Sequence, residues 1–233
     1  MRKGLYETLT TGCSSLDTLL EGGLPLNGVT LVYGAAETGK TSLAIQCATY
    51  CARRGQKILF VDSDGTFSTQ RLSQIAYQDL EEISSRIILM QPTTFGEQGH
   101  VIGHLDRYVS EKFGLVVVDT VTSLYRVELG GSDVTFTLNR ELNGQVASLA
   151  EVAKTRRVAV FITSQVRSVF LGQFNRVEPV ATRTLKFWSS VVLNLEPAGQ
   201  KGVLKAIREK HPRRKRPASC YVTLEKTGIL DYG

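Results

Sequence analysis

The sequence predicts an α/β protein whose sheet is mostly parallel and doubly wound, with antiparallel strands toward the C-terminal end. Short apolar runs rich in β-branched residues alternate with longer helix-like segments, the order found in parallel βαβ units. These runs are apolar throughout and do not alternate with polar residues, which is typical of a sheet covered on both faces. From residue 189 onward the runs follow one another without room for crossover helices, so antiparallel pairing is expected there.

The individual elements can be placed by their residue ranges. Five buried strands are expected in the first two thirds of the chain, over residues 29–33, 57–62, 86–90, 115–119 and 158–163. Helices are expected over residues 40–54, where Gly55 can act as a C-cap, and over residues 95–113 and 137–156. Residues 164–186 are polar, basic and irregular and predict a long loop. Three antiparallel strands are then expected, over residues 189–196, 203–208 and 220–225.

Composition limits the class of protein. The 233 residues suffice for one well-buried α/β domain, expected over residues 1–233, and are few for two. Hydrophobic content of 42% and charged content of 21% argue against wholesale disorder. The N-terminal MRKGLYETLT has no apolar signal-peptide region, and no stretch approaches the roughly 20 apolar residues of a membrane span. We therefore expect a soluble cytoplasmic protein without membrane association.

Charge is concentrated in one segment. Residues 201–216, KGVLKAIREKHPRRKR, contain eight Lys or Arg and one Glu, a local charge of +7. Because the whole chain carries +6, the remaining 217 residues together carry −1. A nearly neutral protein with one cationic segment is expected to bind anions locally.

Cysteine and histidine give little indication of a metal site. The four cysteines lack CxxC spacing and are expected to be buried, reduced thiols: Cys13, Cys47, Cys51 and Cys220. His100 and His104 stand four apart on an expected helix, but Val101 occupies the position where the zincin pattern requires Glu. Surface or partly buried histidines are the simpler interpretation.

The stretch GAAETGKT matches the P-loop pattern in every fixed position. Its glycines allow successive backbone N–H groups to face phosphate oxygens, and the helix that follows directs its positive end at the same anion. Lys40 can reach the β- and γ-phosphates, and the Thr41 hydroxyl suits Mg²⁺. The predicted nucleotide-binding residues are Gly34, Ala35, Ala36, Glu37, Thr38, Gly39, Lys40, Thr41 and Ser42.

An acid is also required beside the metal, at the end of a neighbouring strand. The run LVVVD ends in Asp119, which is therefore predicted to support Mg²⁺ together with Thr41. A second apolar run, in FVDSDGTF, ends in Asp62 and Asp64. A calcium loop of the EF-hand type is excluded there, because its third oxygen ligand and its final Glu are missing.

With these motifs in order, the chain resembles the RecA-family recombinase core, and most of all its archaeal members. The resemblance covers nearly the whole chain. It rests on five segments: TTGCSSLDTLLEGGLP (10–25), the P-loop, FVDSDGTFSTQRL (60–72), LVVVDTVTSLYR (115–126) and FITSQ (161–165). It implies a RecA-like P-loop NTPase core that uses ATP and Mg²⁺. No separate N-terminal DNA-binding domain is expected.

The resemblance also implies roles for individual residues. Asp64 would be the catalytic acid that orients the attacking water, and Gln165 would sense the γ-phosphate. Arg71 would stack on the adenine, a contact that suits a guanidinium group. Four arginines would face DNA from the two loops that follow the central strands: Arg126, Arg167, Arg176 and Arg183.

One departure from the family has a physical consequence. Larger recombinases have Glu where this chain has Asp64, and Asp is shorter by one C–C bond, about 1.5 Å. A displacement of that size at a catalytic group can cost about a hundredfold in rate. We therefore expect tight ATP binding, weak DNA-dependent ATP hydrolysis, and nucleotide acting mainly as a switch.

The cationic segment includes Pro212 and Pro217, which predict an exposed turn between antiparallel strands. A merely solvated turn or a targeting signal would look similar. Given the resemblance, we expect DNA contact by Lys210, Arg213, Arg214, Lys215 and Arg216. Lys/Arg clusters without interleaved aromatic residues neutralise phosphates and do not read bases, so binding should be independent of sequence.

The function expected from the sequence is therefore that of an ATP-dependent, DNA-binding accessory protein of homologous recombination and DNA repair. Its expected partners are DNA, single-stranded more than double-stranded, and a recombinase or other repair proteins; whether it forms a homo-oligomer stays open. Two alternatives also stay open. One is an active DNA-dependent ATPase that performs strand exchange, and the other is a KaiC-like regulatory ATPase, which shares the opening segment and the P-loop.

Overall fold

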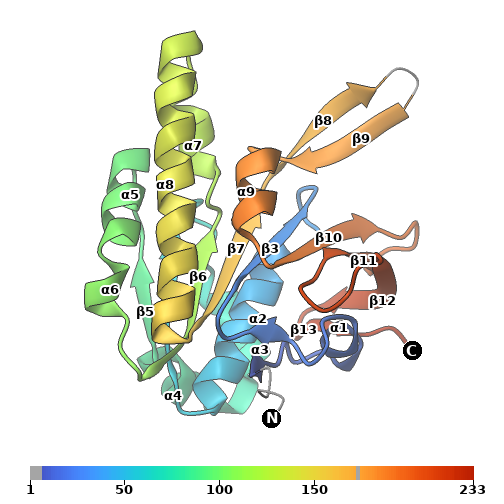
Figure 1. The fold of residues 1–233 in the computed structure, drawn as a ribbon. Coiled ribbons are helices and arrows are strands. Elements are labelled where there is room, and N and C mark those ends of the chain that lie inside the picture. Colours follow the sequence, from blue (N-terminus) through green and yellow to red (C-terminus); the bar gives the residue numbers. More distant parts are fainter. Residues whose placement is uncertain (1–6, 172–173) are drawn as a thin grey trace, which may run out of the picture.

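The computed structural model describes residues 7–171 and 174–233, and only the backbone of residues 167–171 and 174–177 (Figure 1). Within the described residues a nine-stranded sheet forms the centre, in the order β13-β12-β11-β10-β3-β7-β6-β4-β5. Its parallel strands are β3 (Val29–Gly34), β4 (Lys57–Asp62), β5 (Ile87–Met90), β6 (Phe113–Asp119), β7 (Ala159–Ser164) and β10 (Val191–Pro197). Its antiparallel strands are β11 (Val203–Lys210), β12 (Ala218–Glu225) and β13 (Gly228–Asp231). The predicted combination of a parallel sheet with C-terminal antiparallel strands is confirmed.

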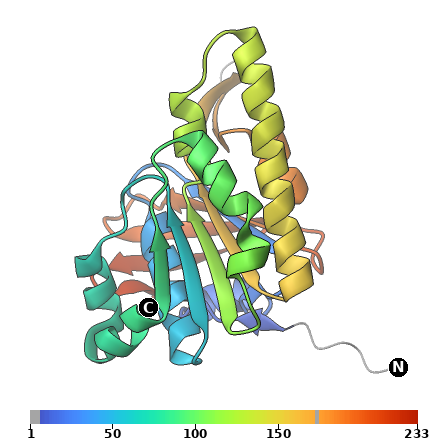
Figure 2. The same cartoon turned by 90° about the vertical axis from the view of Figure 1, so that its left-hand side faces the viewer.

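Helices cover both faces of the parallel strands, which explains why those strands are apolar throughout (Figure 2). Successive residues point to opposite faces, so Phe60 and Val117 enter one core while Leu59 and Val116 enter the other. The first core contains α1 (Ser14–Leu19), α2 (Lys40–Arg53), α3 (Thr69–Ala76) and α4 (Leu80–Ser85). The second contains α5 (Phe95–Gly103), α6 (Leu105–Tyr108), α7 (Ser123–Val127), α8 (Ser132–Arg156) and α9 (Thr182–Trp188).

The small elements complete the structure. A short pair, β1 (Thr8–Leu9) and β2 (Leu24–Pro25), lies beside α1, and the 3₁₀ turn η1 (Tyr77–Asp79) connects α3 and α4. The pair β8 (Val166–Leu171) and β9 (Phe174–Pro179) forms an antiparallel hairpin that projects beyond the sheet (Figure 1). No helix in the described part of the chain is long and apolar enough to cross a membrane.

The prediction of a long loop over residues 164–186 was wrong. The structure has the β8–β9 hairpin there, followed by the first part of α9. The hairpin belongs to a separate two-stranded sheet, so neither strand is a continuous apolar run of the kind that marked the central strands. Backbone pairing between the two arms holds it, and composition shows this poorly.

Two predicted helices also have different boundaries. The segment predicted as one helix over residues 95–113 is α5 followed by α6, and Phe113 already belongs to β6. The helix predicted from residue 137 begins five residues earlier, at Ser132, and its first turns protrude above the sheet (Figure 2). Because that protruding end has little to pack against, it lacks the apolar periodicity that identifies an amphipathic helix.

Candidate functional site

The P-loop connects β3 to α2 and takes the form that anion binding requires. Gly34 ends β3, and a Cβ at this position would lie 2.3 Å from the carbonyl oxygen of Leu195 on the neighbouring strand. Gly39 has a φ of +78° directly before the first residue of α2. A side chain is excluded at the first position and disfavoured at the second, so both fixed glycines have a structural reason.

Lys40 lies folded over the loop. Its Nζ donates to the carbonyl oxygens of Gly34 at 3.0 Å and Ala35 at 2.7 Å. Partial burial lowers the pKa of this ammonium, while the carboxylates of Asp119 and Asp64 act in the opposite direction. A cation held inside the loop by backbone carbonyls is ready to turn toward a phosphate.

Asp119 ends β6 and is fully buried, and only one of its two carboxylate oxygens has a hydrogen-bond partner among the described residues. Its Oδ1 accepts a hydrogen bond from the Thr163 hydroxyl of β7. Burial raises the pKa of Asp119, while the nearby hydroxyls of Thr163 and Thr41 oppose that rise. Its Oδ2 has no hydrogen-bond partner among the described residues. A buried carboxylate oxygen without a partner, beside a threonine hydroxyl, fits the hard oxygen ligands and water shell of Mg²⁺.

The two acids of FVDSDGTF have different environments. Asp62 is buried and accepts from the backbone N–H groups of Thr66 and Phe67, at 3.0 and 3.1 Å, and from Gln91 at 3.0 Å. It therefore fixes the loop that follows β4 and acts as a supporting polar group. Asp64 is exposed, and its backbone N–H donates to the carbonyl oxygen of Asp119 at 3.3 Å.

Gln165 connects the loop after β4, which contains Asp64, to α7, the first helix after β6. Its amide nitrogen lies 3.4 Å from each carboxylate oxygen of Asp64, and its Oε1 accepts a hydrogen bond from Arg126 of α7. Ser123, which begins α7, donates to the carbonyl oxygen of Ser63 at 2.9 Å. The segments after β4, β6 and β7 are thus joined at the carboxyl edge of the sheet, where parallel strands commonly place their ligands.

Arg71 borders a second part of this edge. Its guanidinium donates to the Ser42 hydroxyl at 3.0 Å and to the carbonyl oxygens of Glu225 and Lys226 at 2.7 and 2.6 Å. Partial burial lowers its pKa. A cavity of about 410 Å³ lies here, between the P-loop, Arg71 and the side chain of Leu224. Such a space, with an apolar side chain and a planar cation on its walls, suits a nucleobase.

Two of the arginines predicted to face DNA line one large cavity. It measures about 980 Å³ between α7, α8, α9 and the base of the β8–β9 hairpin, and Arg126 and Arg183 lie on its wall. Arg167 and Arg176 lie in β8 and β9, and their side chains are outside the described part of the structure.

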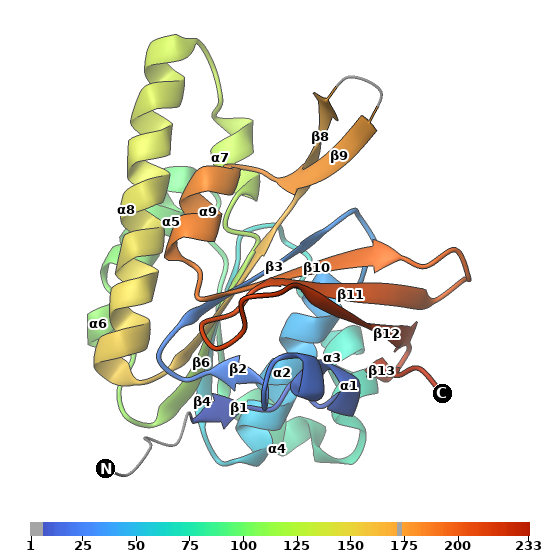
Figure 3. The same ribbon diagram turned by 45° about the vertical axis from the view of Figure 1, so that its right-hand side comes forward.

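The cationic turn lies elsewhere. Register places Lys210 beside Val192 and Val192 beside Leu31, three residues or about 10 Å before Gly34 along β3. The turn between β11 and β12 continues away from the P-loop, so the turn and the β8–β9 hairpin occupy opposite ends of the sheet (Figure 3). The sequence predicted the exposed turn correctly, but gave no indication that it is remote from the nucleotide-binding residues.

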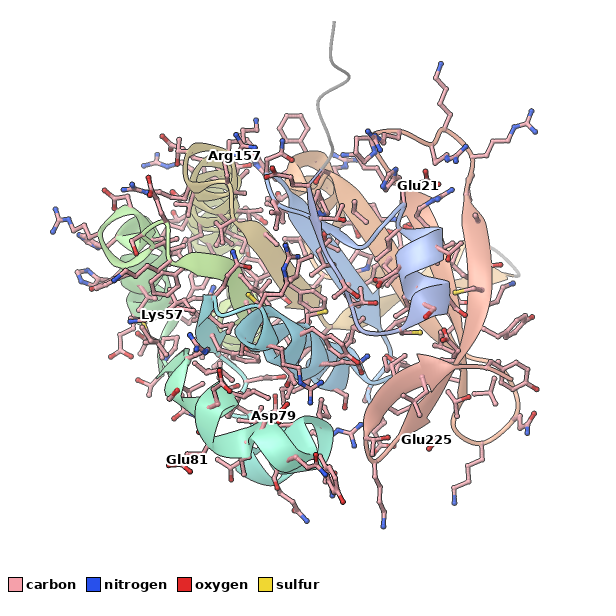
Figure 4. The ribbon with its side chains drawn as sticks, turned by 90° about the horizontal axis from the view of Figure 1, so that it is seen from below. Glu21, Lys57, Asp79, Glu81, Arg157 and Glu225 are labelled. Atoms are coloured by element: carbon pink, nitrogen blue, oxygen red, sulfur yellow. The ribbon has the colours of Figure 1, made fainter. Side chains whose placement is uncertain are left out.

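Several cations of this segment have structural contacts. Arg208 is buried and donates to the carbonyl oxygen of Leu19, and Lys210 donates to that of Lys186. Arg214 forms a bidentate ion pair with Glu21, which lies on the face seen from below in Figure 4. All five residues predicted to bind DNA in this segment are exposed: Lys210 at the end of β11, and Arg213, Arg214, Lys215 and Arg216 in the turn. The turn therefore keeps a cationic surface although Arg214 is partly neutralised.

The exposure predicted for the cysteines and for His100 and His104 agrees with the structure, except at Cys220. All four cysteines are free thiols; Cys220 is half-buried and the other three are buried. His104 contacts the backbone carbonyl of His100, and the described residues contain no group of three or more potential metal ligands of the His, Cys, Asp and Glu types.

Three residues of this edge were missed from the sequence. Thr163 donates to Asp119, the predicted metal ligand. Leu224 and Glu225, near the C-terminus, line the cavity of about 410 Å³ beside Arg71. Thr163 stands two residues before Gln165 at the end of a buried strand, and its polar side chain in an apolar run was a usable signal. Leu224 and Glu225 had none, because only sheet order brings β12 near the P-loop.

Comparison with known proteins identifies the family. The family model described as Rad51 matches residues 2–232, nearly the whole chain. The chain belongs to the Rad51 family. Similar proteins named DNA repair and recombination protein RadB occur in Methanococcoides burtonii, with 33% identity over 97% of this chain and 99% of that protein, and in Thermococcus gammatolerans, with 38% identity over 96% and 98%. A crystal structure described as the RadB recombinase superposes with a TM-score of 0.82 at 35% identity, covering 97% of this chain and all of the other.

Membership of the Rad51 family confirms the resemblance to the RecA-family recombinase core, and with it the fold expected from five motifs. The chain is RadB-like over 96–97% of its length. Among the alternatives left open by the sequence, the KaiC-like regulatory ATPase is set aside, because the match to the Rad51 family spans the chain from end to end.

Proposed function

We propose that this protein is an ATP- and Mg²⁺-dependent, DNA-binding accessory protein of homologous recombination and DNA repair, in which nucleotide acts mainly as a switch. The observation that carries the proposal is the convergence at one sheet edge of Lys40, Asp119 and the Asp64–Gln165 pair, in direct contact with Arg126. The similar proteins named for DNA repair and recombination support the same assignment.

Each P-loop residue has a distinct task in binding. Lys40 leaves the carbonyls of Gly34 and Ala35 for the β- and γ-phosphates, and the backbone N–H groups of the loop hold the phosphate oxygens. Thr41 and Asp119 would hold Mg²⁺, which would supply charge neutralisation for the phosphates. Arg71 and Leu224 enclose the base.

The switch consists of the contacts around Gln165. Asp64 orients the attacking water, and Gln165 shares its side chain between Asp64 and Arg126. A γ-phosphate near Asp64 competes for the Gln165 amide, and any movement of Gln165 changes the support of Arg126. Nucleotide binding thereby alters the segments that follow β6 and β7, which is the ordering type of switch seen in nucleotide-binding proteins.

DNA would contact two surfaces. Arg126 and Arg183, with Arg167 and Arg176 on the hairpin strands, would bind the strand beside the nucleotide-responsive segments. Lys210 and the exposed cations of the β11–β12 turn would bind phosphates at the other end of the sheet, without reading sequence. Single-stranded DNA is the favoured ligand, and a recombinase or another repair protein the favoured partner.

Equilibrium binding tests the proposal. Fluorescent ATP and a labelled single-stranded oligonucleotide should each bind the wild-type protein, and nucleotide should change the affinity for DNA. Lys40→Ala should lose nucleotide affinity by at least about tenfold and should abolish the effect of nucleotide on DNA binding. Lys57→Ala is the matched control, because Lys57 is exposed at the other end of β4. Nucleotide binding that survives Lys40→Ala, or DNA binding indifferent to nucleotide, would overturn the proposal.

An active strand-exchange ATPase is the second candidate. It uses the same residues, and the exposed, well-connected position of Asp64 is compatible with turnover. Fast DNA-stimulated hydrolysis together with long filaments would favour this candidate over an accessory role.

A further inference from the structure

Thr163 makes a contact that the roles proposed above leave unused. It is fully buried at the end of β7, and its hydroxyl donates to Oδ1 of Asp119. Asp119 is itself completely shielded from solvent, so water cannot supply this hydrogen bond from the surface. A buried carboxylate is stable and correctly oriented only when protein donors satisfy part of it.

The contact determines which carboxylate oxygen remains available. Thr163 occupies Oδ1, whereas Oδ2 has no partner among the described residues. If the Thr163 hydroxyl were absent, the carboxylate could rotate about its Cβ–Cγ bond and offer either oxygen. Thr163 therefore fixes the rotation of the group and leaves Oδ2 as the oxygen available to Mg²⁺.

Thr41 cannot replace Thr163 in this task. Its hydroxyl lies close enough to Asp119 to lower the pKa of that carboxyl, but it is the group proposed to bind Mg²⁺ directly. A hydroxyl whose oxygen faces a metal ion is not available to orient Asp119. Thr163 lies on a different strand, two positions before Gln165, and is not one of the residues proposed to bind the metal.

We propose that Thr163 is a positioning residue for Mg²⁺, which acts through Asp119 by holding one carboxylate oxygen and leaving the other for the water shell of the metal. This inference rests on the proposed function. Partners that orient metal ligands in this manner typically contribute 10- to 100-fold to metal affinity. Strand β7 thus supplies Thr163 to Asp119, and the residue directly after the strand, Gln165, contacts Asp64.

The test measures the Mg²⁺ concentration that half-saturates the binding of fluorescent ATP at equilibrium, without turnover. Thr163→Val, which keeps the shape and removes the hydroxyl, should raise that concentration by about 10- to 100-fold. Nucleotide affinity without metal should stay at the wild-type value. Thr30→Val is the matched control, because Thr30 is equally buried on adjacent β3 and its hydroxyl has no partner among the described residues.

A second pair keeps the test decisive if Thr163→Val fails to fold. Thr163→Ser and Thr163→Ala differ by the hydroxyl alone, and the serine variant should bind Mg²⁺ more tightly by a similar factor. Equal Mg²⁺ dependence in the members of either pair would overturn the role of Thr163 while leaving the proposed function intact. Wild-type nucleotide binding that ignores Mg²⁺ would overturn the proposed metal site itself, and the role of Thr163 with it.

Discussion

Gln165 donates its side-chain amide to both carboxylate oxygens of Asp64, at 3.4 Å each, although the two residues stand 101 positions apart in the chain. The contact joins the ends of β4 and β7, which are not neighbours in the sheet, because β6 lies between them. The Asp64 side chain, although shorter than that of glutamate, therefore reaches past the end of β6, where Asp119 lies, to contact Gln165.

Lengthening the acidic side chain at position 64 should increase the rate of ATP hydrolysis. Asp64→Glu moves the carboxylate forward by about 1.5 Å, and we expect turnover to rise by up to about a hundredfold. Asp64→Asn should reduce turnover to background, because an amide cannot accept the proton of the attacking water. Turnover is measured by phosphate release, and fluorescent ATP should bind all three proteins equally. A glutamate variant no faster than wild type would contradict the idea that reach limits hydrolysis.

Neutralising the β11–β12 turn should weaken the salt dependence of DNA binding. Replacing Arg213, Arg214, Lys215 and Arg216 by alanine removes up to four phosphate contacts, which should flatten the slope of log affinity against log salt by up to about three units for single strands. Fluorescence anisotropy at several salt concentrations gives the slope. Arg214 should contribute least, because it pairs with Glu21.

The control removes the same charge outside the cationic segment, from four exposed cations: Lys57, Arg107, Lys112 and Lys154. Its slope should stay close to that of the wild type. Equal slopes in both quadruple variants would show that net charge, and not the turn, accounts for the effect.

Asp231 should contribute stability that is lost in acid. Its carboxylate accepts from the backbone N–H of Ser15 at 2.6 Å and from the Cys13 thiol at 3.2 Å, and these donors lower its pKa to about 2 from an ordinary value near 3.8. Because the pKa of Asp231 is lower in the folded state than in the unfolded state, the ionised carboxylate stabilises the protein fully at pH values above the unfolded-state pKa. This contribution disappears as the pH falls from about 4 to 2.

Urea unfolding checks this expectation. Asp231→Asn should lower the midpoint relative to wild type at pH 7, and the gap should narrow as the pH falls below 4. Asp133→Asn is a suitable control, because Asp133 is exposed and lies at the protruding end of α8. A gap that is constant between pH 7 and pH 3 would show that the charge of Asp231 is not involved.

Gln46 should be important for stability although it lies outside the nucleotide-binding residues. It is buried on α2, donates to the carbonyl oxygens of Thr11 and Ile229 at 3.0 Å each, and accepts from the Ile229 N–H at 2.6 Å. Gln46→Leu leaves these buried backbone groups without partners, which should cost on the order of 3 kcal/mol in the free energy of unfolding. Denaturant titration measures the cost, and Gln78→Leu, at an exposed position, should change little.

Gly34→Ala should abolish nucleotide binding. The added Cβ would lie 2.3 Å from the carbonyl oxygen of Leu195 and 2.7 Å from the Thr38 hydroxyl, so the loop must move away from its phosphate-binding form. Gly144→Ala is the control, since a Cβ there meets nothing within 4 Å and should stabilise α8 by up to about 1 kcal/mol. An alanine at position 34 that binds fluorescent ATP normally would contradict the proposed role of close packing against β10.

Much of the fold could be predicted because local chemistry was sufficient. β4 is apolar from Ile58 to Val61 because helices cover both of its faces, and its predicted bounds agree with the structure. The P-loop is defined by adjacent residues whose backbone form depends on two glycines, so a short segment carries the whole signal. The hairpin β8–β9 was missed because pairing between its two arms, and not burial in the central sheet, defines it.

The sequence by itself determined the chemical identity of the groups: a P-loop lysine, two strand-end acids, a glutamine near a third strand end and a cationic turn. Tertiary structure decided which of them meet. It joined Asp64 to Gln165 and Arg126, gave Asp119 a hydrogen bond from Thr163, and placed the cationic turn at the far end of the sheet. The physical reason is that strand order and register, which fix these distances, depend on contacts between residues far apart in the chain, and no local pattern encodes them.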